Sequence, residues 1–303
     1  MTQVRTNGIF LEAEVLPPPA PPPGAPARLP VLLIMGLGMQ LTAWPDEFVQ
    51  GLLDRGHAVV RFDNRDIGLS SKLGTWGRPN LMFAAFKQAV GLPVRAAYTL
   101  HDMARDTDGM LEALGMPRVH VVGVSIGGMI GQLLAAQYPG RVASFTCVMS
   151  SSGAPHLPGP TPAARRALLD RPKNPHDHDA AVDHFMKVYR AIGSPGYATP
   201  EPMLRQRILR GIRRSVHPLG FVRQVVAIAA TGDRSRLLAK IKAPTTVVHG
   251  RDDPLVPVAA ATDLAGKIPG GQLRIIDGMG HDLPTPLVPT LLAAVEATIA
   301  RAG

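Results

Sequence analysis

A serine between glycines, set between two apolar segments, constrains the fold of this chain more than any other feature. The pentapeptide GVSIG, residues 123–127, follows the apolar run Val119–Val124 and precedes the apolar segment Ile126–Tyr138, which ends at Pro139-Gly140. A short apolar run of this kind is typical of a buried strand, and the segment after it is typical of a helix. Glycines at the flanking positions permit a tight strand-to-helix turn. The sequence therefore predicts an α/β fold in which Ser125 projects from a sharp turn.

Strand-like and helix-like segments alternate on both sides of this turn, as apolar periodicity and capping residues indicate. Strands are predicted at Val31–Met35, Ala58–Phe62, Val142–Met149, Thr245–Val248 and Gln272–Ile276, helices at Trp44–Arg55, Thr99–Leu114 and Thr285–Ala300, and an opening strand or hairpin at Thr6–Val15 around Asn7-Gly8. The helix at Trp44 would hold Pro45 in its first turn. Repeated βα units predict a mostly parallel central sheet flanked by helices.

The pattern changes between Ser151 and Gly232, where proline, glycine and arginine mix with short amphipathic segments and strand signals fade. We therefore expect one core in two parts, residues 1–150 and 233–303, with a helical cap inserted at residues 151–232. The proline-rich stretch Pro17–Pro30 is expected to be a stiff surface connector. The apolar run Leu81–Val90 is expected either to line an entrance to a site or to pack in the core or against the cap.

Charge and cysteine content narrow the class of protein. The 32 Lys and Arg residues exceed the 23 Asp and Glu residues, for a net charge of +9. The basic residues are scattered without a nucleic-acid-binding signature, so we expect no nucleic-acid partner. No apolar run approaches the roughly 18 residues of a membrane span, and no secretory signal is visible. The single cysteine, Cys147, lies in an apolar run that predicts a buried thiol, and a cytoplasmic location is expected.

A serine hydroxyl is a weak nucleophile and needs a base within hydrogen-bond reach. The segment GMGH, residues 278–281, follows the last predicted strand, where a loop can carry an imidazole over the edge of the sheet. We therefore predict His281 as the general base.

A carboxylate is needed to hold the histidine in one tautomer. The segment GRDDP, residues 250–254, offers two candidates, of which Asp253 is favoured. No Asp or Glu occurs from Arg141 through Leu169, so an acid after the preceding strand is excluded. Asp277 and Asp282 are expected to cap or solvate their turns. The resulting order of Ser, Asp and His along the chain is that of the α/β hydrolases.

Acyl transfer also requires amides directed at the oxyanion. One candidate is the N–H of Ile126, directly after the serine. The other is the N–H of Leu37, since the segment GLG at residues 36–38 permits an exposed backbone after a predicted strand.

With these residues located, the sequence resembles the α/β-hydrolase superfamily over nearly its whole length. The matching segments, in family order, are residues 34–38 (IMGLG), residues 62–70 (FDNRDIGLS), the turn at Ser125 and the loops at Asp253 and His281. The chain looks most like the branch that contains the aclacinomycin methylesterases. Met35 departs from the histidine that many members of the wider superfamily carry at this place.

The resemblance implies hydrolysis of carboxylic esters without a cofactor, through an acyl-enzyme, with an oxyanion hole from Leu37 and Ile126. A small-molecule ester with an apolar part is the expected substrate, and no metal is expected. Three alternatives stay open: a perhydrolase of the haloperoxidase type, a carbon–carbon bond hydrolase on the same triad, and a ligand-binding protein without catalysis. The serine at the turn argues against haloalkane dehalogenases and epoxide hydrolases, which resemble this chain but use aspartate.

Two clusters of polar residues in the expected cap are interpreted as structural and not as functional. The cluster between His176 and His184 contains metal-ligand types, but its spacing matches no known metal site, so a polar loop is expected. The five arginines between Arg205 and Arg214 alternate with apolar residues, which predicts an amphipathic helix with a solvated basic face. If this face overhangs the site, it would attract anionic substrates or anionic membrane surfaces.

Overall fold

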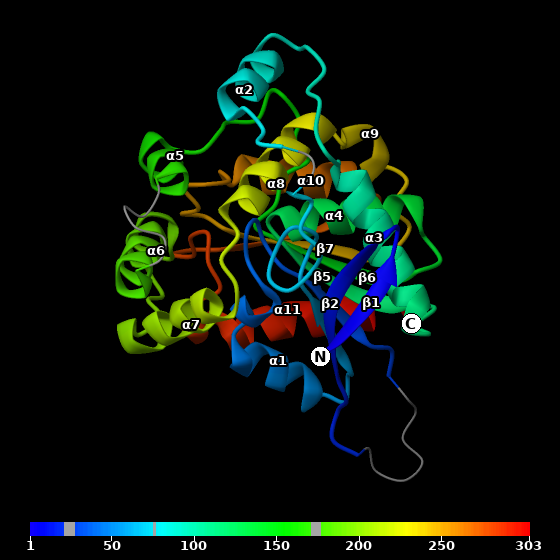
Figure 1. The fold of residues 1–303 in the computed structure, drawn as a ribbon. Coiled ribbons are helices and arrows are strands. Elements are labelled where there is room, and N and C mark those ends of the chain that lie inside the picture. Colours follow the sequence, from blue (N-terminus) through cyan, green and yellow to red (C-terminus); the bar gives the residue numbers. More distant parts are fainter. Residues whose placement is uncertain (21–27, 75–76, 171–176) are drawn as a thin grey trace.

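The computed structural model describes residues 1–20, 28–74, 77–170 and 177–303. Residues 21–27 of the expected connector Pro17–Pro30 therefore lie outside the described residues, as does His176. Within them the centre of the molecule is a sheet of eight strands in the order β1-β2-β4-β3-β5-β6-β7-β8 (Figure 1). The strands are β1 Thr2–Thr6, β2 Ile9–Leu16, β3 Val31–Ile34, β4 Val59–Phe62, β5 Val119–Val124, β6 Val142–Val148, β7 Thr245–Gly250 and β8 Gln272–Ile276.

The predicted mostly parallel sheet is confirmed. Strands β1 and β2 pair antiparallel, β2 pairs antiparallel with β4, and all later neighbours pair parallel. The opening hairpin turns at Asn7 and Gly8, which both have positive φ, as two-residue hairpin turns require. Every residue of β3, β5, β6 and β7 is buried, which explains their continuous apolar runs.

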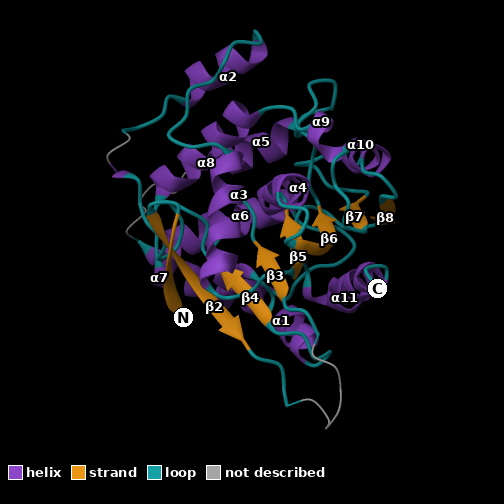
Figure 2. Ribbon diagram, turned by 90° about the vertical axis from the view of Figure 1, so that its right-hand side faces the viewer, coloured by secondary structure: helices purple, strands orange, loops and turns teal. Residues whose placement is uncertain are grey.

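Helices cover both faces of the sheet, as Figure 2 shows. The helices are α1 Asp46–Leu53, α2 Leu81–Ala89, α3 Leu100–Ala113, α4 Ile126–Gln137, α5 Pro162–Leu169, α6 His178–Ile192, α7 Glu201–Arg214, α8 Pro218–Thr231, α9 Ser235–Leu238, α10 Ala259–Lys267 and α11 Val288–Ala300. Helices α1 and α11 pack on one face in a cluster that includes Trp44 and Leu291. Helices α3, α4 and α10 pack on the other face in a cluster that includes Met110 and Leu264.

Several predicted helices form with small differences at their ends. Thr99 caps α3 through a capping box with Asp102. Both residue types favour the N-terminus of a helix, so a helix start here was expected. Pro45 is the N-cap of α1 and not part of its first turn, because the helix begins one residue later at Asp46. The last predicted helix begins with a 3₁₀ turn at Thr285–Leu287 before α11.

The described part of residues 151–232 holds helices α5 to α8 and contributes no strand to the sheet. Helices α6 and α7 pack through a small apolar cluster of their own, made of Ala181, Val182, Met186, Ile208 and Ile212. The predicted amphipathic character of α7 is thereby confirmed. The cluster is separate from the two clusters that line the sheet, so this segment has its own minor core.

Cys147 is the second-to-last residue of β6 and is buried, as predicted from its apolar setting. Burial raises the pKa of its thiol to about 12, so the group stays protonated at neutral pH. None of the helices in the described part of the chain has the length and the apolar character that crossing a bilayer requires.

Candidate active site

The turn that carries Ser125 connects β5 directly to α4. Ser125 has φ 56° and ψ −118°, a conformation that residues other than glycine rarely adopt. A Cβ at Gly127 would lie 2.0 Å from the carbonyl oxygen of Ile34, and one at Gly123 would lie 2.4 Å from the carbonyl oxygen of Gly127. Both positions are thus restricted to glycine, and the predicted sharp turn is confirmed.

Ser150 supports this turn from the end of the neighbouring strand. Its hydroxyl donates to the carbonyl oxygen of Ser125 over 2.8 Å, and its Cβ lies 2.7 Å from the position that a Cβ on Gly128 would take. The sequence reasoning did not identify Ser150. Its position directly after a predicted buried strand beside the turn was the available signal.

The structure brings the three predicted side chains together in one hydrogen-bonded series. His281 Nε2 lies 3.1 Å from Ser125 Oγ, and His281 Nδ1 lies 2.7 Å from Asp253 Oδ2. A carboxylate can only accept hydrogen bonds, so Nδ1 carries the proton and Nε2 of the neutral ring faces the serine hydroxyl. The side chain of Asp253 is fully buried and that of His281 nearly so, whereas Ser125 is partly exposed.

The loop after β7 fixes the Asp253 carboxylate. Its Oδ1 accepts from the backbone N–H groups of Leu255 and Val256 at 2.9 and 2.8 Å, which leaves Oδ2 for His281. The ring of His249 lies 3.5 Å from Oδ2 and hydrogen-bonds the carbonyl oxygen of Val256. Burial lowers the pKa of His249, so this imidazole is neutral near pH 7.

The two predicted oxyanion amides belong to the first residue of α4 and to the loop after β3. Helix α4 begins at Ile126, and the first amides of a helix lack an intrahelical acceptor. Gly36 passes close to the serine, with 3.6 Å between Ser125 Cβ and the position of a Cβ on that glycine. Leu37 follows in the same loop.

Helix α8 holds the loop that carries Leu37. The backbone N–H of Gly38 donates to Gln224 Oε1 over 2.9 Å, and Gln224 Nε2 donates to the carbonyl oxygen of Arg65. Phe221 lies against Gly38, where a Cβ would be 2.8 Å from its ring. Gln224 was not predicted, because a glutamine in a helix of unknown packing carries no signal in the sequence.

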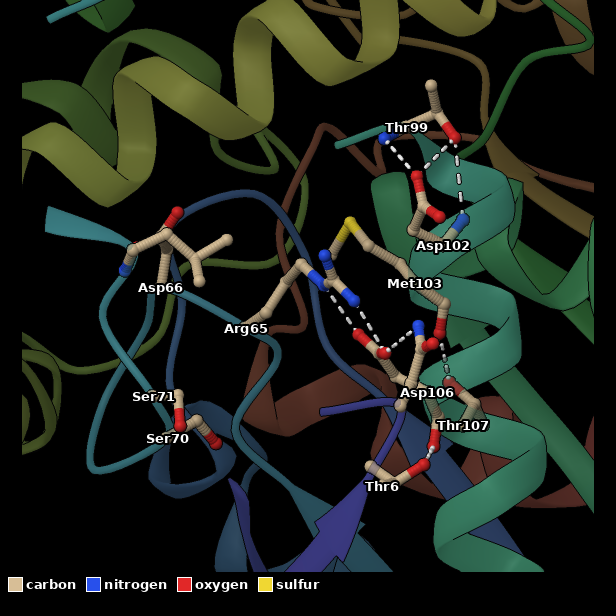
Figure 3. Close-up of polar contacts among 12 residues, drawn as sticks. Thr6, Arg65, Asp66, Ser70, Ser71, Thr99, Asp102, Met103, Asp106 and Thr107 are labelled. Atoms are coloured by element: carbon tan, nitrogen blue, oxygen red, sulfur yellow. Dashed lines mark hydrogen bonds and ion pairs between the residues drawn. The ribbon is translucent and has the colours of Figure 1, made fainter. Parts of the chain in front are cut away.

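The loop after β4 also contacts α8. It contains most of the run at residues 62–70 that resembles the α/β hydrolases. Arg65 points from this loop toward α3 and forms two hydrogen bonds of 2.5 Å with the Asp106 carboxylate (Figure 3). Asp66 accepts from Arg223 of α8 at 3.0 Å. Asp63 accepts from the backbone of Leu41 at 2.8 Å, so the loop contacts α3, α8 and the segment after β3.

The basic face of α7 is not simply solvated, because several of its arginines form ion pairs. Arg205, Arg210 and Arg214 pair with Asp183, Asp46 and Asp63, respectively. Arg214 is largely buried against Asp63, with 2.5 Å between Nη1 and Oδ2. The expectation of a simple solvated face is therefore wrong for Arg214, because the α7 terminus meets a buried carboxylate of the core.

The two aspartates near His281 differ in their surroundings. Asp277 is exposed and pairs with Arg251, in line with a solvated turn. Asp282 instead faces residues 151–232, where its Oδ1 accepts from both the backbone N–H and the hydroxyl of Ser194. Burial raises the pKa of Asp282. Among the described residues, no three His, Cys, Asp or Glu side chains are grouped so that they could hold a metal ion.

This fold, with its serine turn, belongs to a known family: the sequence pattern of the alpha/beta hydrolase fold matches residues 30–284, so the chain is a member of that family. Over 294 residues the chain is 29% identical to a rhodomycin D methylesterase of a Streptomyces species, covering 90% of this chain and 92% of that protein. It is 25% identical over 255 residues to a 2-hydroxy-6-oxononadienedioate/2-hydroxy-6-oxononatrienedioate hydrolase of Cupriavidus pinatubonensis, covering 83% and 80%.

Solved structures show the same fold. The enol-lactonase from Burkholderia xenovorans superposes with a TM-score of 0.69 at 19% sequence identity, covering 99% of this chain and 100% of that one. The predicted α/β-hydrolase fold and the predicted membership of the superfamily are thus confirmed.

Proposed function

We propose that this protein is a serine hydrolase that cleaves carboxylic esters, with Ser125 as nucleophile, His281 as general base and Asp253 as the residue that orients the base. The observation that carries the proposal is the unbroken series of hydrogen-bond distances from Asp253 through His281 to Ser125, 2.7 and 3.1 Å. The similarity to a methylesterase over most of both chains supports an ester as substrate.

In the first half of the reaction, Ser125 Oγ attacks the ester carbonyl carbon while His281 Nε2 takes the hydroxyl proton. The Asp253 carboxylate stabilises the imidazolium that forms. The tetrahedral intermediate collapses as the bond to the leaving alcohol breaks, and His281 returns its proton to that alcohol. An acyl-enzyme on Ser125 remains.

In the second half, His281 takes a proton from water, which attacks the acyl carbonyl, and the acid leaves as Ser125 recovers its proton. The backbone N–H groups of Leu37 and Ile126 hold the oxyanion in both halves. Beyond the ester and the water molecule, the chain itself supplies every group that these steps use.

Residues 151–232 form the cap in this proposal. They bring Phe221 against the loop of Leu37 and meet the loop of His281 through Ser194. An aromatic ring beside the oxyanion loop favours a small-molecule ester with an apolar part.

The test is the Ser125→Ala variant in ester hydrolysis and in labelling by a fluorophosphonate probe. Turnover of p-nitrophenyl esters is expected to fall by about 10⁴-fold or more, and labelling is expected to disappear. Ser235→Ala, which removes a hydroxyl bound to Asp233, is the matched control and should retain both signals. Undiminished ester turnover in Ser125→Ala would contradict the assignment. Absence of labelling in the unmodified protein would favour a ligand-binding role.

Carbon–carbon bond hydrolysis is the second candidate, since the name of the relative from Cupriavidus describes a keto acid without an ester bond. The two candidates differ in the bond that breaks. Comparing p-nitrophenyl esters with a vinylogous diketone on the same preparation separates them, and faster turnover of the diketone would replace the ester proposal.

A further inference from the structure

The loop that carries His281 is bound along its length to the segment after α6. Gly196 N–H donates to the carbonyl oxygen of Gly278 over 2.9 Å, and His281 N–H donates to the carbonyl oxygen of Ile192 over 2.6 Å. A Cβ on Gly280 would lie 2.3 Å from the carbonyl oxygen of Gly193, so the two backbones touch directly.

Ser194 lies at the centre of this contact. Its hydroxyl accepts from Gly280 N–H over 2.9 Å and donates to Asp282 Oδ1 over 2.5 Å. Gly280 and Asp282 are the residues immediately before and after His281. One buried hydroxyl therefore bridges both neighbours of the base, while the Ile192 carbonyl holds the base's own amide.

Within the described residues, the ring nitrogens of His281 hydrogen-bond Asp253 and Ser125. These contacts set the rotation of the ring, but the position of the ring's Cα depends on the loop. A displacement of about 1 Å in a catalytic group can cost up to roughly a hundredfold in rate.

We propose that Ser194 is a positioning residue that holds the backbone on both sides of His281 at the distance from Ser125 that proton transfer needs. This inference rests on the proposed function of His281. It assigns to residues 151–232 a part in assembling the catalytic groups, in addition to covering them.

The test is the Ser194→Ala variant, measured as kcat per active site titrated with the fluorophosphonate probe. We expect kcat per titrated site to fall about tenfold with KM changed less than about twofold, because the substrate contacts are untouched. Ser194→Thr keeps the hydroxyl and should recover most of the loss. A purely structural role would lower the melting temperature and the number of titratable sites but leave kcat per site unchanged.

Ser152→Ala is the matched control, since that hydroxyl also donates to a carboxylate, Asp263 at 2.6 Å, and accepts from a backbone N–H. Its kcat per site should stay at the value of the unmodified protein. Asp282→Ala should also lower kcat per site, because it removes the acceptor of both the hydroxyl and the backbone N–H of Ser194. The double variant should lose less than the product of the two single losses, because the two changes share the hydrogen bond between the hydroxyl and the carboxylate.

Unchanged kcat per site in Ser194→Ala, with Ser125→Ala inactive, would overturn this inference alone. Full activity of Ser125→Ala would overturn the proposed function and this inference with it. The two failures are therefore distinguishable.

Helix α2 carries an independent feature. Five large apolar side chains with more than half of their surface exposed fall within eleven residues: Met82, Phe83, Phe86, Val90 and Leu92. The buried Ala84 belongs to the inner side of α2, and the helix packs on α8. Figures 1 and 2 both show α2 at one extremity of the molecule. Of the alternatives expected for this run, packing in the core is therefore wrong, whereas contact with residues 151–232 is present through α8.

The stretch of sequence that contains α2 has charges of one sign. No Asp or Glu occurs between Asp66 and Asp102, whereas Arg78, Lys87 and Arg95 do, together with Lys72, whose ammonium binds the carbonyl oxygens of Gly68 and Ser70. Within the helix, the Lys87 ammonium lies 4.8 Å from the centre of the Phe83 ring, so charged and apolar groups share one surface. Exposed aromatic side chains beside basic ones are typical of helices that lie in the headgroup region of anionic bilayers.

We infer that α2 docks the protein on the surface of an anionic phospholipid bilayer, with the two phenylalanines inserted and the basic residues at the phosphates. At low salt, the fraction of protein that co-sediments with phosphatidylglycerol vesicles is expected to be at least tenfold the fraction that co-sediments with phosphatidylcholine vesicles. High salt should weaken the binding.

The double variant Phe83→Ser/Phe86→Ser should lose most of the binding and keep its ester turnover in solution. Phe10→Ser, which removes a similarly exposed ring on β2, is the matched control and should bind like the unmodified protein. Equal binding of the double variant to the vesicles would overturn the inference. So would a concentration-dependent dimer that only the double variant abolishes, because a second copy of the chain would then cover α2.

Discussion

The parallel strands that carry the serine turn and the helices of residues 151–232 are held in place by different forces. Every residue of strands β3, β5, β6 and β7 is buried, and a Cβ added to Gly123 or Gly127 would lie 2.0 to 2.4 Å from a backbone oxygen. The helical segment has a small apolar cluster of its own, adds Ala227 of α8 to a cluster on the sheet, and reaches the core through polar contacts, among them Arg214 with Asp63 and Arg223 with Asp66. Close packing therefore fixes the nucleophile, whereas directional polar contacts contribute more to the placement of the helical segment.

The largest effect is expected where packing is tightest. Gly127→Ala would push a methyl group into the backbone at Ile34, and we expect it to lower the free energy of unfolding by at least about 3 kcal/mol. Denaturant titration measures this. Gly266→Ala in α10 adds a methyl group in open space and should stay within about 1 kcal/mol of the unmodified protein, or exceed it. Similar unfolding free energies for both variants would show that the steric contact at Gly127 does not determine the loss.

The next effect is expected at the buried polar contact between the two regions. Arg214→Met leaves the Asp63 carboxylate buried without its cation, at an expected cost of about 2–3 kcal/mol in the free energy of unfolding. Adding Asp63→Asn to that variant should recover part of the loss, since no uncompensated charge then remains. A loss that the second substitution does not reduce would mean that packing, and not charge, dominates this contact.

Acid should act on the sheet through His120 of β5. Burial lowers the pKa of its imidazole to about 4, and its Nδ1 lies 2.8 Å from Ser144 Oγ. Between the ordinary pKa of 6.5 and about 4, the unfolded chain binds a proton that the folded chain does not, so stability falls as the pH drops through that window. Below pH 4 this contribution stays constant.

The expected loss is on the order of 1–2 kcal/mol, less than the full shift because solvent screens part of it. It is measured as the difference in unfolding free energy between pH 7 and pH 4.5. His120→Asn should show a shallower decline than the unmodified protein over the same range. Identical declines would assign the acid sensitivity to other groups.

The smallest effect is expected at an exposed polar contact of the helical segment. Arg210 pairs with Asp46 at 2.9 Å, but both side chains are substantially exposed. Arg210→Gln should change the free energy of unfolding by no more than about 1 kcal/mol, and added salt should reduce the difference further. A cost equal to that of Arg214→Met would show that burial does not separate the two contacts.

The sequence was sufficient to predict the sheet and the positions of its catalytic candidates, because both depend on local patterns. Continuous apolar runs mark strands buried on both faces, and Gly123 and Gly127 mark the tight turn at Ser125. Ser125, Asp253 and His281 follow predicted strands, so the carboxyl edge of a parallel sheet brings them together.

The supports of that site could not be predicted, because they depend on long-range contacts of single polar atoms. Ser194 lies in a glycine- and proline-rich stretch that reads as an ordinary loop, and Gln224 lies in a helix whose packing the sequence leaves open. The exposure of α2 was not predicted, for another reason. An apolar run suggests burial, and its exposed face contradicts that general tendency.

Because Cys147 is buried inside β6, the protein is well suited to site-specific labelling at an introduced cysteine. A thiol-reactive dye would find no target in the folded chain, so a cysteine introduced on the surface of α6 would be the sole attachment point. A spectroscopic reporter there could follow movement of the helices against the sheet during turnover. Modification of Cys147 itself would record only those openings that separate the central strands.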